Sequence, residues 1–155
     1  MEQSGQFVIR VYGLILSQNG EVLVTDEYQL DQRMTKFPGG GLHFGEGPVD
    51  CLAREIREEC NDQEICHIQH FYTTGFFQKA LFYPNHQLIS IYYTAELCGP
   101  PAFRISEKAF DFEPGINGSQ SFRWAAINML DPEEFSFPID KLVAAQLKDH
   151  LKQSG

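Results

Sequence analysis

A glycine-rich segment followed directly by an acid-rich segment constrains this chain more than any other feature. Residues 40–62 read GGLHFGEGPVDCLAREIREECND. Pro48 suits the first position of an α-helix, where its missing N–H costs nothing. Side chains three and four residues apart share one helix face, so Glu55, Glu58 and Glu59 are expected side by side, with Cys51 one turn earlier. The segment therefore predicts a glycine turn, a proline-started helix and a carboxylate face.

The apolar residues of this helix occupy a second strip, which can pack inward. It consists of Val49, Leu52, Ile56 and Cys60. On the acidic strip, like charges at these spacings repel unless a cation lies among them. Clustered oxygen atoms favour hard divalent cations. We therefore predict a site for Mg²⁺ or Mn²⁺ on the acidic strip; the alternative is an ordinary solvated helix face.

The spacing of these residues resembles the signature of the Nudix hydrolases. The resemblance rests on Gly40, Glu46 and residues 54–59 (REIREE), and residues 37–40 (FPGG) resemble the usual lead-in. The family is known for metal-dependent cleavage of nucleoside diphosphates linked to another group. The resemblance implies an α/β (α+β) fold, an α/β/α sandwich with a mixed β-sheet, as one domain over residues 1–155. Asn61 and Asp62 depart from the glycine and aliphatic residue usual there, but Asn61 suits a left-handed helix end.

The resemblance also implies roles for individual residues. The metal ligands would be the Gly40 carbonyl, Glu55, Glu58 and Glu59. The catalytic residues would be Glu55, Glu58 and Arg54, with Arg54 holding Glu55 or Glu46 by a charge-assisted pair. Glu55 is either a ligand or the base that activates water. An acid outside the motif could take the second role, and the candidates are Glu96, Glu107, Asp111 and Glu113.

Two further positions keep alternatives open. Glu46 precedes the helix, where an acid favours the positive end of the helix dipole, so a structural charge and a ligand role are equally open. Substrate contacts are expected from Lys36 on phosphates and Phe76 on a base, with further contacts from Gly39, Gly40 and Phe44.

The substrate class is predicted from subgroup residues of the family that this sequence lacks. Some sixteen residues beyond the motif, Gln78, Lys79 and Ala80 stand where subgroup tags carry proline or tyrosine. The junction at residues 44–46 looks more like that of nucleoside-triphosphate members. We therefore expect a nucleoside triphosphate to be cleaved to a monophosphate and pyrophosphate. The alternatives are a nucleotide-sugar or another nucleoside-diphosphate derivative, or a sensor without catalysis.

The charge and composition of the chain limit the kinds of partner that it is expected to bind. The formal net charge of −9 argues against a protein that coats nucleic acid, but not against binding one small polyphosphate beside a metal. No apolar run could span a bilayer, and residues 1–6 lack the pattern of a signal peptide. The four cysteines show no zinc-ligand spacing and are expected to be reduced in the cytoplasm. We therefore predict that the protein binds a small nucleotide and neither a nucleic acid polymer nor a membrane. A homodimer is possible.

Periodicity and turn residues predict the remaining elements. Strands are expected at residues 7–16, 22–24 (after a turn at 19–20), 35–37, 65–77, 87–97 and 121–127, with brief pairing at 42–44. Residues 30–36 are expected to be mostly a polar connection, 131–134 a helical turn and 139–151 an amphipathic helix, with Leu142, Val143, Leu147 and Leu151 facing inward. The segment 103–119 is either a lid or a flexible insertion.

Overall fold

The computed structural model describes residues 4–154, so Met1 to Gln3, part of the segment tested for a signal peptide, and Gly155 lie outside it. Its elements are β1 (Gln6–Ile15), β2 (Glu21–Gln29), β3 (Gln32–Lys36), β4 (Gly39–Gly41), α1 (Pro48–Glu59), β5 (Ile65–Thr73), β6 (His86–Leu97), β7 (Ser119–Ala126), the short 3₁₀ helices η1 (Ile127–Met129) and η2 (Pro132–Glu134), and α2 (Pro138–Ser154).

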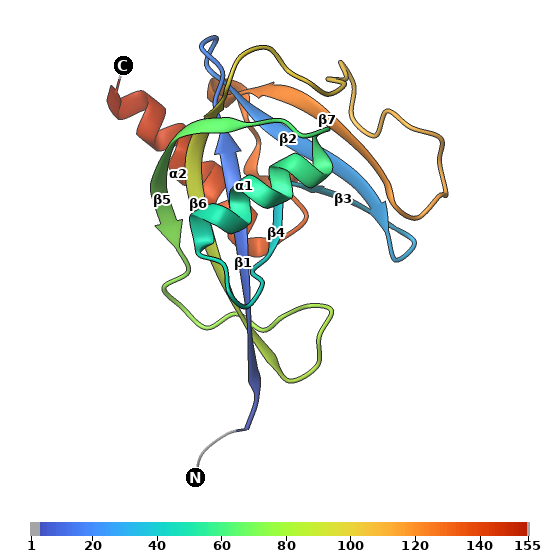
Figure 1. The fold of residues 1–155 in the computed structure, drawn as a ribbon, viewed down its shortest axis with the longest axis vertical. Helices are drawn as coiled ribbons and strands as arrows, with labels where there is room; N and C mark the ends of the chain where they lie inside the picture. The colour runs from blue at the N-terminus through green and yellow to red at the C-terminus, as the bar shows by residue number, and fades with distance from the viewer. Residues whose placement is uncertain (1–3, 155) are drawn as a thin grey trace.

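The strands form two sheets. The first has the order β4-β1-β6-β5 and is mixed, since β1 and β6 run parallel while the other pairs are antiparallel. The second has the order β3-β2-β7 and is antiparallel throughout. The expected mixed sheet is therefore confirmed for the first group of strands, and a second sheet stands beside it (Figure 1).

Two hydrophobic cores separate the sheets from the two long helices. Along β1, Tyr12 and Leu14 enter a core with Val143 and Leu147 of α2. Val11 and Ile15 point the other way, because strand side chains alternate, and they pack with Leu52, Ile56 and other residues of α1. Figure 1 shows α1 in front of the strands and α2 behind them. This arrangement is the predicted helix–sheet–helix sandwich.

The α1 helix begins at Pro48, as predicted, and its last residue is Glu59. Just beyond the helix, Asn61 has the expected left-handed conformation, with φ +51°. One prediction about its faces is wrong, because Val49 is exposed instead of inward-facing. Cys51 lies on the strip of Arg54 and Glu55, as predicted, but it is fully buried there. The reason is that α1 packs against the β4 turn as well as the sheet, so the buried arc is shifted toward Cys51, whose thiol lies 3.5 Å from the Gly41 carbonyl oxygen.

Several predicted boundaries are also corrected. Residues 30–36 are mainly β3, joined to β2 by a tight turn at Leu30 and Asp31, both with positive φ. The strand expected at 65–77 ends at Thr73, and Ile127 begins a 3₁₀ helix. In the 42–44 segment, only Leu42 pairs with β1, through its N–H and the Ile9 carbonyl.

The amphipathic helix α2 differs from the prediction on its outer edges. Val143 and Leu147 are buried, but Leu142 and Leu151 are exposed, and Ile139 and Ala144 complete the inward face. The helical turn at residues 131–134 is confirmed as η2, whose Asp131 side chain accepts a hydrogen bond from the Glu133 N–H.

The long segment between β6 and β7 is packed against the body of the protein. Phe103 and Ile105 join the core beneath α1, and the Ser106 N–H donates to the Phe122 carbonyl at 2.6 Å. The Phe110 N–H donates to the buried carboxylate of Asp26 at 3.3 Å. These contacts anchor residues 103–110 to the body of the protein, whereas residues 113–118 are exposed. None of the helices within residues 4–154 is long and apolar enough to cross a membrane.

Candidate active site

The strand β4 brings the glycine turn against the acidic face of α1. Gly39 has φ +149°, a conformation that side chains disfavour, and it pairs with Tyr12 of β1. At Gly40, an added Cβ would lie 2.5 Å from Oε1 and 2.6 Å from Oε2 of Glu55. Glycine is therefore required at residue 40 for the Glu55 carboxylate to lie against the strand backbone.

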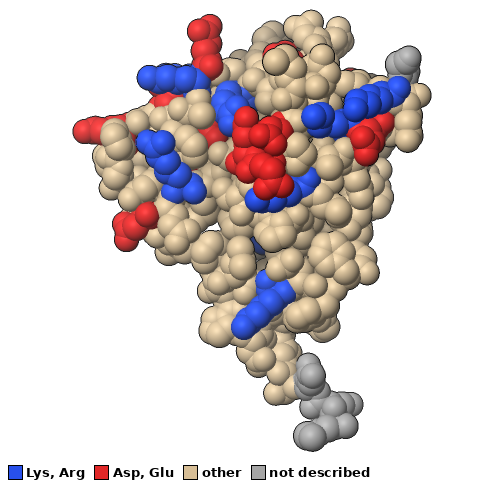
Figure 2. Space-filling view, turned by 180° about the vertical axis from the view of Figure 1, so that it is seen from behind, with Lys and Arg blue, Asp and Glu red and all other residues tan. Residues whose placement is uncertain are grey.

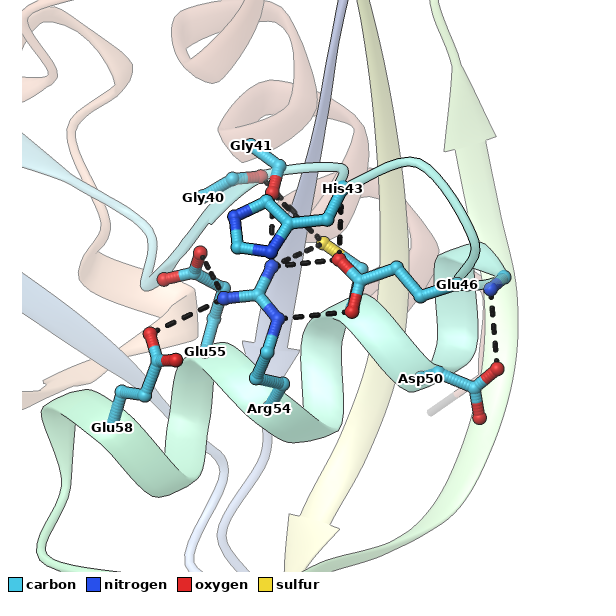
Figure 3. Close-up of polar contacts among 10 residues, drawn as sticks. Gly40, Gly41, His43, Glu46, Asp50, Arg54, Glu55 and Glu58 are labelled. Carbon is cyan, nitrogen blue, oxygen red and sulfur yellow. Dashed lines mark hydrogen bonds and ion pairs between the residues drawn. The ribbon is translucent and has the colours of Figure 1, made fainter.

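Arg54 lies at the centre of the polar network on α1 (Figure 3). Its guanidinium makes a bidentate pair with Glu46, at 2.9 Å from Nε to Oε2 and 2.7 Å from Nη2 to Oε1. Its Nη1 also donates to Glu55 at 3.0 Å and to Glu58 at 3.2 Å, and its Nη2 to the Gly41 carbonyl at 3.0 Å. One cation thus positions three carboxylates and the glycine turn.

The environment of Glu46 favours its structural role. Both carboxylate oxygens accept from Arg54, and Oε1 also accepts from the His43 N–H at 2.9 Å. These hydrogen bonds, chiefly those from Arg54, lower the pKa of Glu46 to about 2. Its oxygens are fully engaged in holding the turn, so the structural charge is the better of the two interpretations left open by the sequence.

Glu59 lies on the inner side of the same helix, in a different environment. Its Oε2 is buried without a hydrogen-bond partner. Burial is the largest cause that raises the pKa of Glu59 to about 8, and the nearby carboxylates of Glu27 and Glu55 raise it further, against the opposing charge of Lys36. Lys36 itself is paired with Glu27, at 3.1 Å between Nζ and Oε2.

The acidic face fits a hard divalent cation. Its donors are the carboxylates of Glu55, Glu58 and Glu59 and the nearby Gly40 carbonyl, which are all oxygen ligands of the kind Mg²⁺ and Mn²⁺ prefer. One guanidinium cannot neutralise this set, and the buried Oε2 of Glu59 has no hydrogen-bond partner. Arg54 joins Glu55 to Glu58, and Glu59 interacts electrostatically with Glu55, so the three acids lie along one side of α1, although their oxygens do not form a compact ligand set in the part of the chain that the structure describes.

Beside the acidic face lies a cavity of about 430 Å³. It lies between the two sheets and is closed on one side by the start of α2 and on another by the β5–β6 connection; residues lining it include Arg10, Tyr12, Glu27, Lys36, Tyr92 and Asp140. Arg10 interacts electrostatically with Glu55, and Lys36 with Glu59. Two cations therefore lie between this cavity and the carboxylates of α1.

A buried carboxyl group forms part of the cavity wall. Asp140, at the start of α2, accepts a hydrogen bond of 2.5 Å from the Tyr92 hydroxyl. Burial is the largest cause that raises the pKa of Asp140 to about 7. Near neutral pH this group is therefore able to accept or to donate a hydrogen bond.

A second cavity, of about 510 Å³, lies on the other side of Glu59. It is lined by the end of α1, the β6–β7 connection and β7, including Glu59, Asn61, Arg104 and Gln120. Glu27, which lines the first cavity, and Gln120, which lines the second, are partners in the β2–β7 register.

The structure separates the predicted substrate residues. Lys36 lines the first cavity and Gly39 and Gly40 lie beside α1, but Phe44 is fully exposed and Phe76 half-exposed, and neither lines either cavity. Figure 2 shows the face opposite α1, where charged side chains gather in the upper half and the lower half is mostly uncharged. The exposed aromatic residues of the β5–β6 connection, Phe76, Phe77, Phe82 and Tyr83, add to the uncharged surface.

The four acids considered as alternative bases differ in their surroundings. Asp111 is paired with Arg104 at 2.5 Å and with Lys108 at 3.6 Å. Glu107 and Glu113 are exposed on the β6–β7 connection. Glu96 lies beside His67 on the first sheet. None of them lines either cavity.

Sequence reasoning missed most of the cavity residues. Lys36 is a predicted phosphate contact, whereas Arg10, Tyr12, Glu27 and Asp140 belong to no motif in the sequence. These cavity residues have no common spacing in the sequence, because they come from three different elements, β1, β2 and α2. A weak signal was present at Asp140, an acid at an otherwise inward-facing position of an amphipathic helix.

The helix–sheet–helix sandwich with a glycine turn packed against an acidic helix is the arrangement expected of a Nudix domain. The family model of the NUDIX domain matches residues 6–146. The chain belongs to this family, and it is a Nudix hydrolase.

The chain is similar to two relatives that are named for their activities. An 8-oxo-dGTP diphosphatase of Escherichia coli (strain K12) is 26% identical over 140 residues, which cover 88% of this chain and 92% of that protein. An RNA pyrophosphohydrolase of Acinetobacter baylyi (strain ATCC 33305 / BD413 / ADP1) is 46% identical over 48 residues, which are 30% of this chain and 28% of that protein. The second match therefore spans less than a third of either chain.

Solved structures agree on the fold. A chain from a study of MutT of Aliivibrio salmonicida and Vibrio cholerae superposes with a TM-score of 0.62 at 21% identity, covering 94% of this chain and 99% of that one. A NUDIX hydrolase from Nitrosomonas europaea gives a TM-score of 0.66 at 15% identity, covering 95% and 90%.

Proposed function

We propose that this protein is a Mg²⁺-dependent hydrolase that cleaves a nucleoside triphosphate to a monophosphate and pyrophosphate. The observation that carries the proposal is that Arg10 and Lys36, which line the 430 Å³ cavity, interact electrostatically with Glu55 and Glu59 of α1. A nucleobase and ribose would occupy the cavity, and the triphosphate would extend past the two cations toward the glutamates.

Each part of the site has a chemical task. Arg10 and Lys36 would bind phosphate oxygens and hold the chain of phosphates in line with the acidic face. The cation held by Glu55, Glu58, Glu59 and the Gly40 carbonyl would supply charge neutralisation and a more acidic water. Glu55, fixed by Arg54, is the candidate base, and Glu58 is the more exposed ligand.

The cavity supports recognition of the base. The carboxyl group of Asp140 lies at the wall and has a pKa near 7, so it can pair with either a donor or an acceptor on the edge of a heterocycle. The relative named 8-oxo-dGTP diphosphatase, similar over most of both chains, supports a purine nucleoside triphosphate as the first substrate to test.

The second cavity favours a second candidate. A nucleoside-diphosphate derivative would place its second group there, across Glu59 from the nucleoside. The two candidates give different products, because only a triphosphate cleaved between its α- and β-phosphates releases pyrophosphate. The homodimer and the cytoplasmic location stay predictions, to be checked by light scattering and by fractionation of cells.

The test is a substrate panel with and without Mg²⁺, scored by the products released. We expect Mg²⁺-dependent release of pyrophosphate from a nucleoside triphosphate. Glu58→Gln should lower kcat by at least about 100-fold, since it removes a negative ligand without changing size. Glu64→Gln is the matched control, because Glu64 is exposed, lies outside α1 and pairs with Arg57 instead of Arg54. Undiminished turnover in Glu58→Gln would refute the assigned metal site.

A further inference from the structure

A second group of ligand-type side chains lies outside the acidic face of α1, where β5 meets the end of β6. Cys66 of β5 stands opposite Glu96 of β6 in the antiparallel register, so their side chains share one face of the sheet. His67 follows Cys66 directly, and its Nε2 lies 3.7 Å from Glu96 Oε2. The three residues are separated from the acidic motif in sequence and come from two different strands.

A bulge in β5 makes this grouping possible. The register advances by three residues on β5, from Cys66 to Gln69, while β6 advances by two, from Glu96 to Thr94. His67 takes the extra position with φ +55°. Neighbouring strand residues normally point to opposite faces, but the bulge turns His67 toward Cys66 and Glu96.

The geometry is close to that of a tetrahedral site. One ligand atom from each of Cys66, His67 and Glu96 lies within 4.8 Å of the other two. Bonds of about 2.0–2.3 Å to a tetrahedral zinc ion require ligand atoms roughly 3.4–3.6 Å apart. The His67–Glu96 separation already nearly meets this requirement, and small side-chain rotations would bring in the sulfur.

A fourth donor lies next to the group. The Cys98 thiol interacts with that of Cys66, which raises the pKa of Cys98 to about 11, although Cys98 lies outside the group whose ligand atoms are within 4.8 Å of one another. The Cys98 N–H also donates to the Glu64 carbonyl at 3.0 Å, which continues the β5–β6 pairing beyond the strand ends. The cluster thus offers two sulfurs, one imidazole nitrogen and one carboxylate oxygen on a partly exposed surface.

We propose that Cys66, His67, Glu96 and Cys98 bind a zinc ion that joins β5 to β6. Thiolate and imidazole ligands favour Zn²⁺ over Mg²⁺, whereas the oxygen-only face of α1 has the opposite preference. The two sites are therefore chemically distinct. Zinc binds deprotonated thiols and a neutral imidazole, so the affinity for zinc should rise with pH.

The ion would stabilise the edge of the sheet under α1. Ile65 and Leu97, which flank the cluster and pair with each other, both pack against the core that contains Leu52 and Ile56 of α1. Strand β5 is an edge strand interrupted by the bulge, so few ladder hydrogen bonds hold this end. A cross-strand ion at this point would substitute for them.

The test uses Co²⁺ as a spectroscopic substitute on the whole protein, kept reduced and in excess Mg²⁺ to occupy the acidic face. We expect one equivalent of Co²⁺ to give thiolate-to-metal charge-transfer and tetrahedral visible bands, which Zn²⁺ then displaces. Zinc at about 100-fold over Kd should raise the Tm by roughly 5–10 °C.

Variants locate the site. Cys66→Ser and His67→Ala should each abolish the charge-transfer band or weaken Co²⁺ affinity at least about 10-fold. His70→Ala is the control and should bind normally, because His70 is exposed on the same strand and contacts Thr73 instead. Retained Mg²⁺-dependent activity in both variants would show that they fold.

Two outcomes would overturn the proposal. One is an unchanged charge-transfer band in Cys66→Ser, which would place the bound metal elsewhere. The other is reduced protein that binds no Co²⁺ but forms a Cys66–Cys98 disulfide when an oxidant is added, which would make the pair a redox site. Neither result depends on whether the nucleotide substrate has been identified correctly.

Discussion

Arg54 does more than balance charge on the acidic helix face. Its five N–H donors are spread over Glu46, Glu55, Glu58 and the Gly41 carbonyl, so a single planar group sets the positions of the turn and of two candidate catalytic acids. Glu59 is the acid of this group to which no Arg54 hydrogen bond is found. We therefore class Arg54 as a positioning residue.

Replacing Arg54 by lysine should show that its shape matters as well as its charge. A lysine ammonium cannot span the bidentate pair with Glu46 and reach Glu55 at once. We expect Arg54→Lys to lower kcat about 10- to 100-fold, with a smaller change in KM, in steady-state assays. Arg57→Lys is the control. Arg57 lies on the same helix as Arg54 and also makes a bidentate pair, with Glu64, but this pair is exposed. Equal losses in the two variants would contradict the assigned role.

The motif residues were predictable at this scale, and the cavity residues were not. Glu55, Glu58 and Glu59 follow from helical spacing, which is local. Glu59 has a different environment from its neighbours only because Lys36 and Glu27 of the second sheet approach it. No periodicity within α1 contains that information.

At the scale of elements, β4 and α1 form one unit. The three-residue strand β4 pairs with β1 on one side and touches the acidic face of α1 on the other. Gly39 lies against the backbone of β1, and Gly40 lies against Glu55 of α1. An added Cβ at Gly39 would overlap the Val11 carbonyl and lie 2.7 Å from the Tyr12 Cα, whereas one at Gly40 would meet only the Glu55 carboxylate.

The two glycines should therefore fail in different ways when changed to alanine. Gly39→Ala pushes on the backbone of β1 and should cost roughly 3 kcal/mol or more of unfolding free energy, measured by urea titration. Gly40→Ala displaces the end of a side chain, so stability should fall little while kcat falls at least about 10-fold. Gly75→Ala is the control, because its Cβ would meet nothing within 4 Å. A Gly40→Ala variant with full activity would contradict the proposed contact.

The element boundaries show where local signals end. The hairpin at Asn19 and Gly20 was predicted from its turn residues, and Gly20 has φ +75°. The β2–β3 turn was missed because Leu30 and Asp31 adopt positive φ without a glycine. The Asn117 side chain accepts a hydrogen bond from the Asp31 N–H and donates one to the Asp31 carboxylate, so part of what holds this turn lies far away in sequence.

At the scale of the whole molecule, the first cavity exists because two sheets and α2 meet. Tyr92 comes from the centre of the first sheet and Asp140 from the start of α2, and their hydrogen bond closes the space between them. Asp140 is fully buried at the base of this junction. Its protonation is therefore tied to the folding of the whole protein.

This linkage predicts a pH-dependent stability. The pKa of Asp140 is raised from 3.8 to about 7, so between these values the unfolded chain has lost a proton that the folded protein keeps. Stability contributed by this group is thus fully present below about pH 4 and falls as the pH rises toward 7. Asparagine keeps the shape and an acceptor for Tyr92 but does not titrate.

We expect Asp140→Asn to gain on the order of 2 kcal/mol of unfolding free energy relative to the wild type between pH 5 and pH 8. The measurement is urea unfolding of both proteins across this range. Comparing the two removes the contribution of Glu59, which titrates in both. Parallel stability curves would mean that Asp140 is ionised in the folded state at pH 5.

The sequence by itself determined the family, the acidic helix face and the apolar strips of most strands, because these depend on spacings within a few residues or one turn. The tertiary structure decided which cations reach the acids, where the cavities lie and how Cys66, His67, Glu96 and Cys98 come together. Those features join residues from different strands and helices, and only the packing of the sheets and a bulge in one strand bring them within reach of one another.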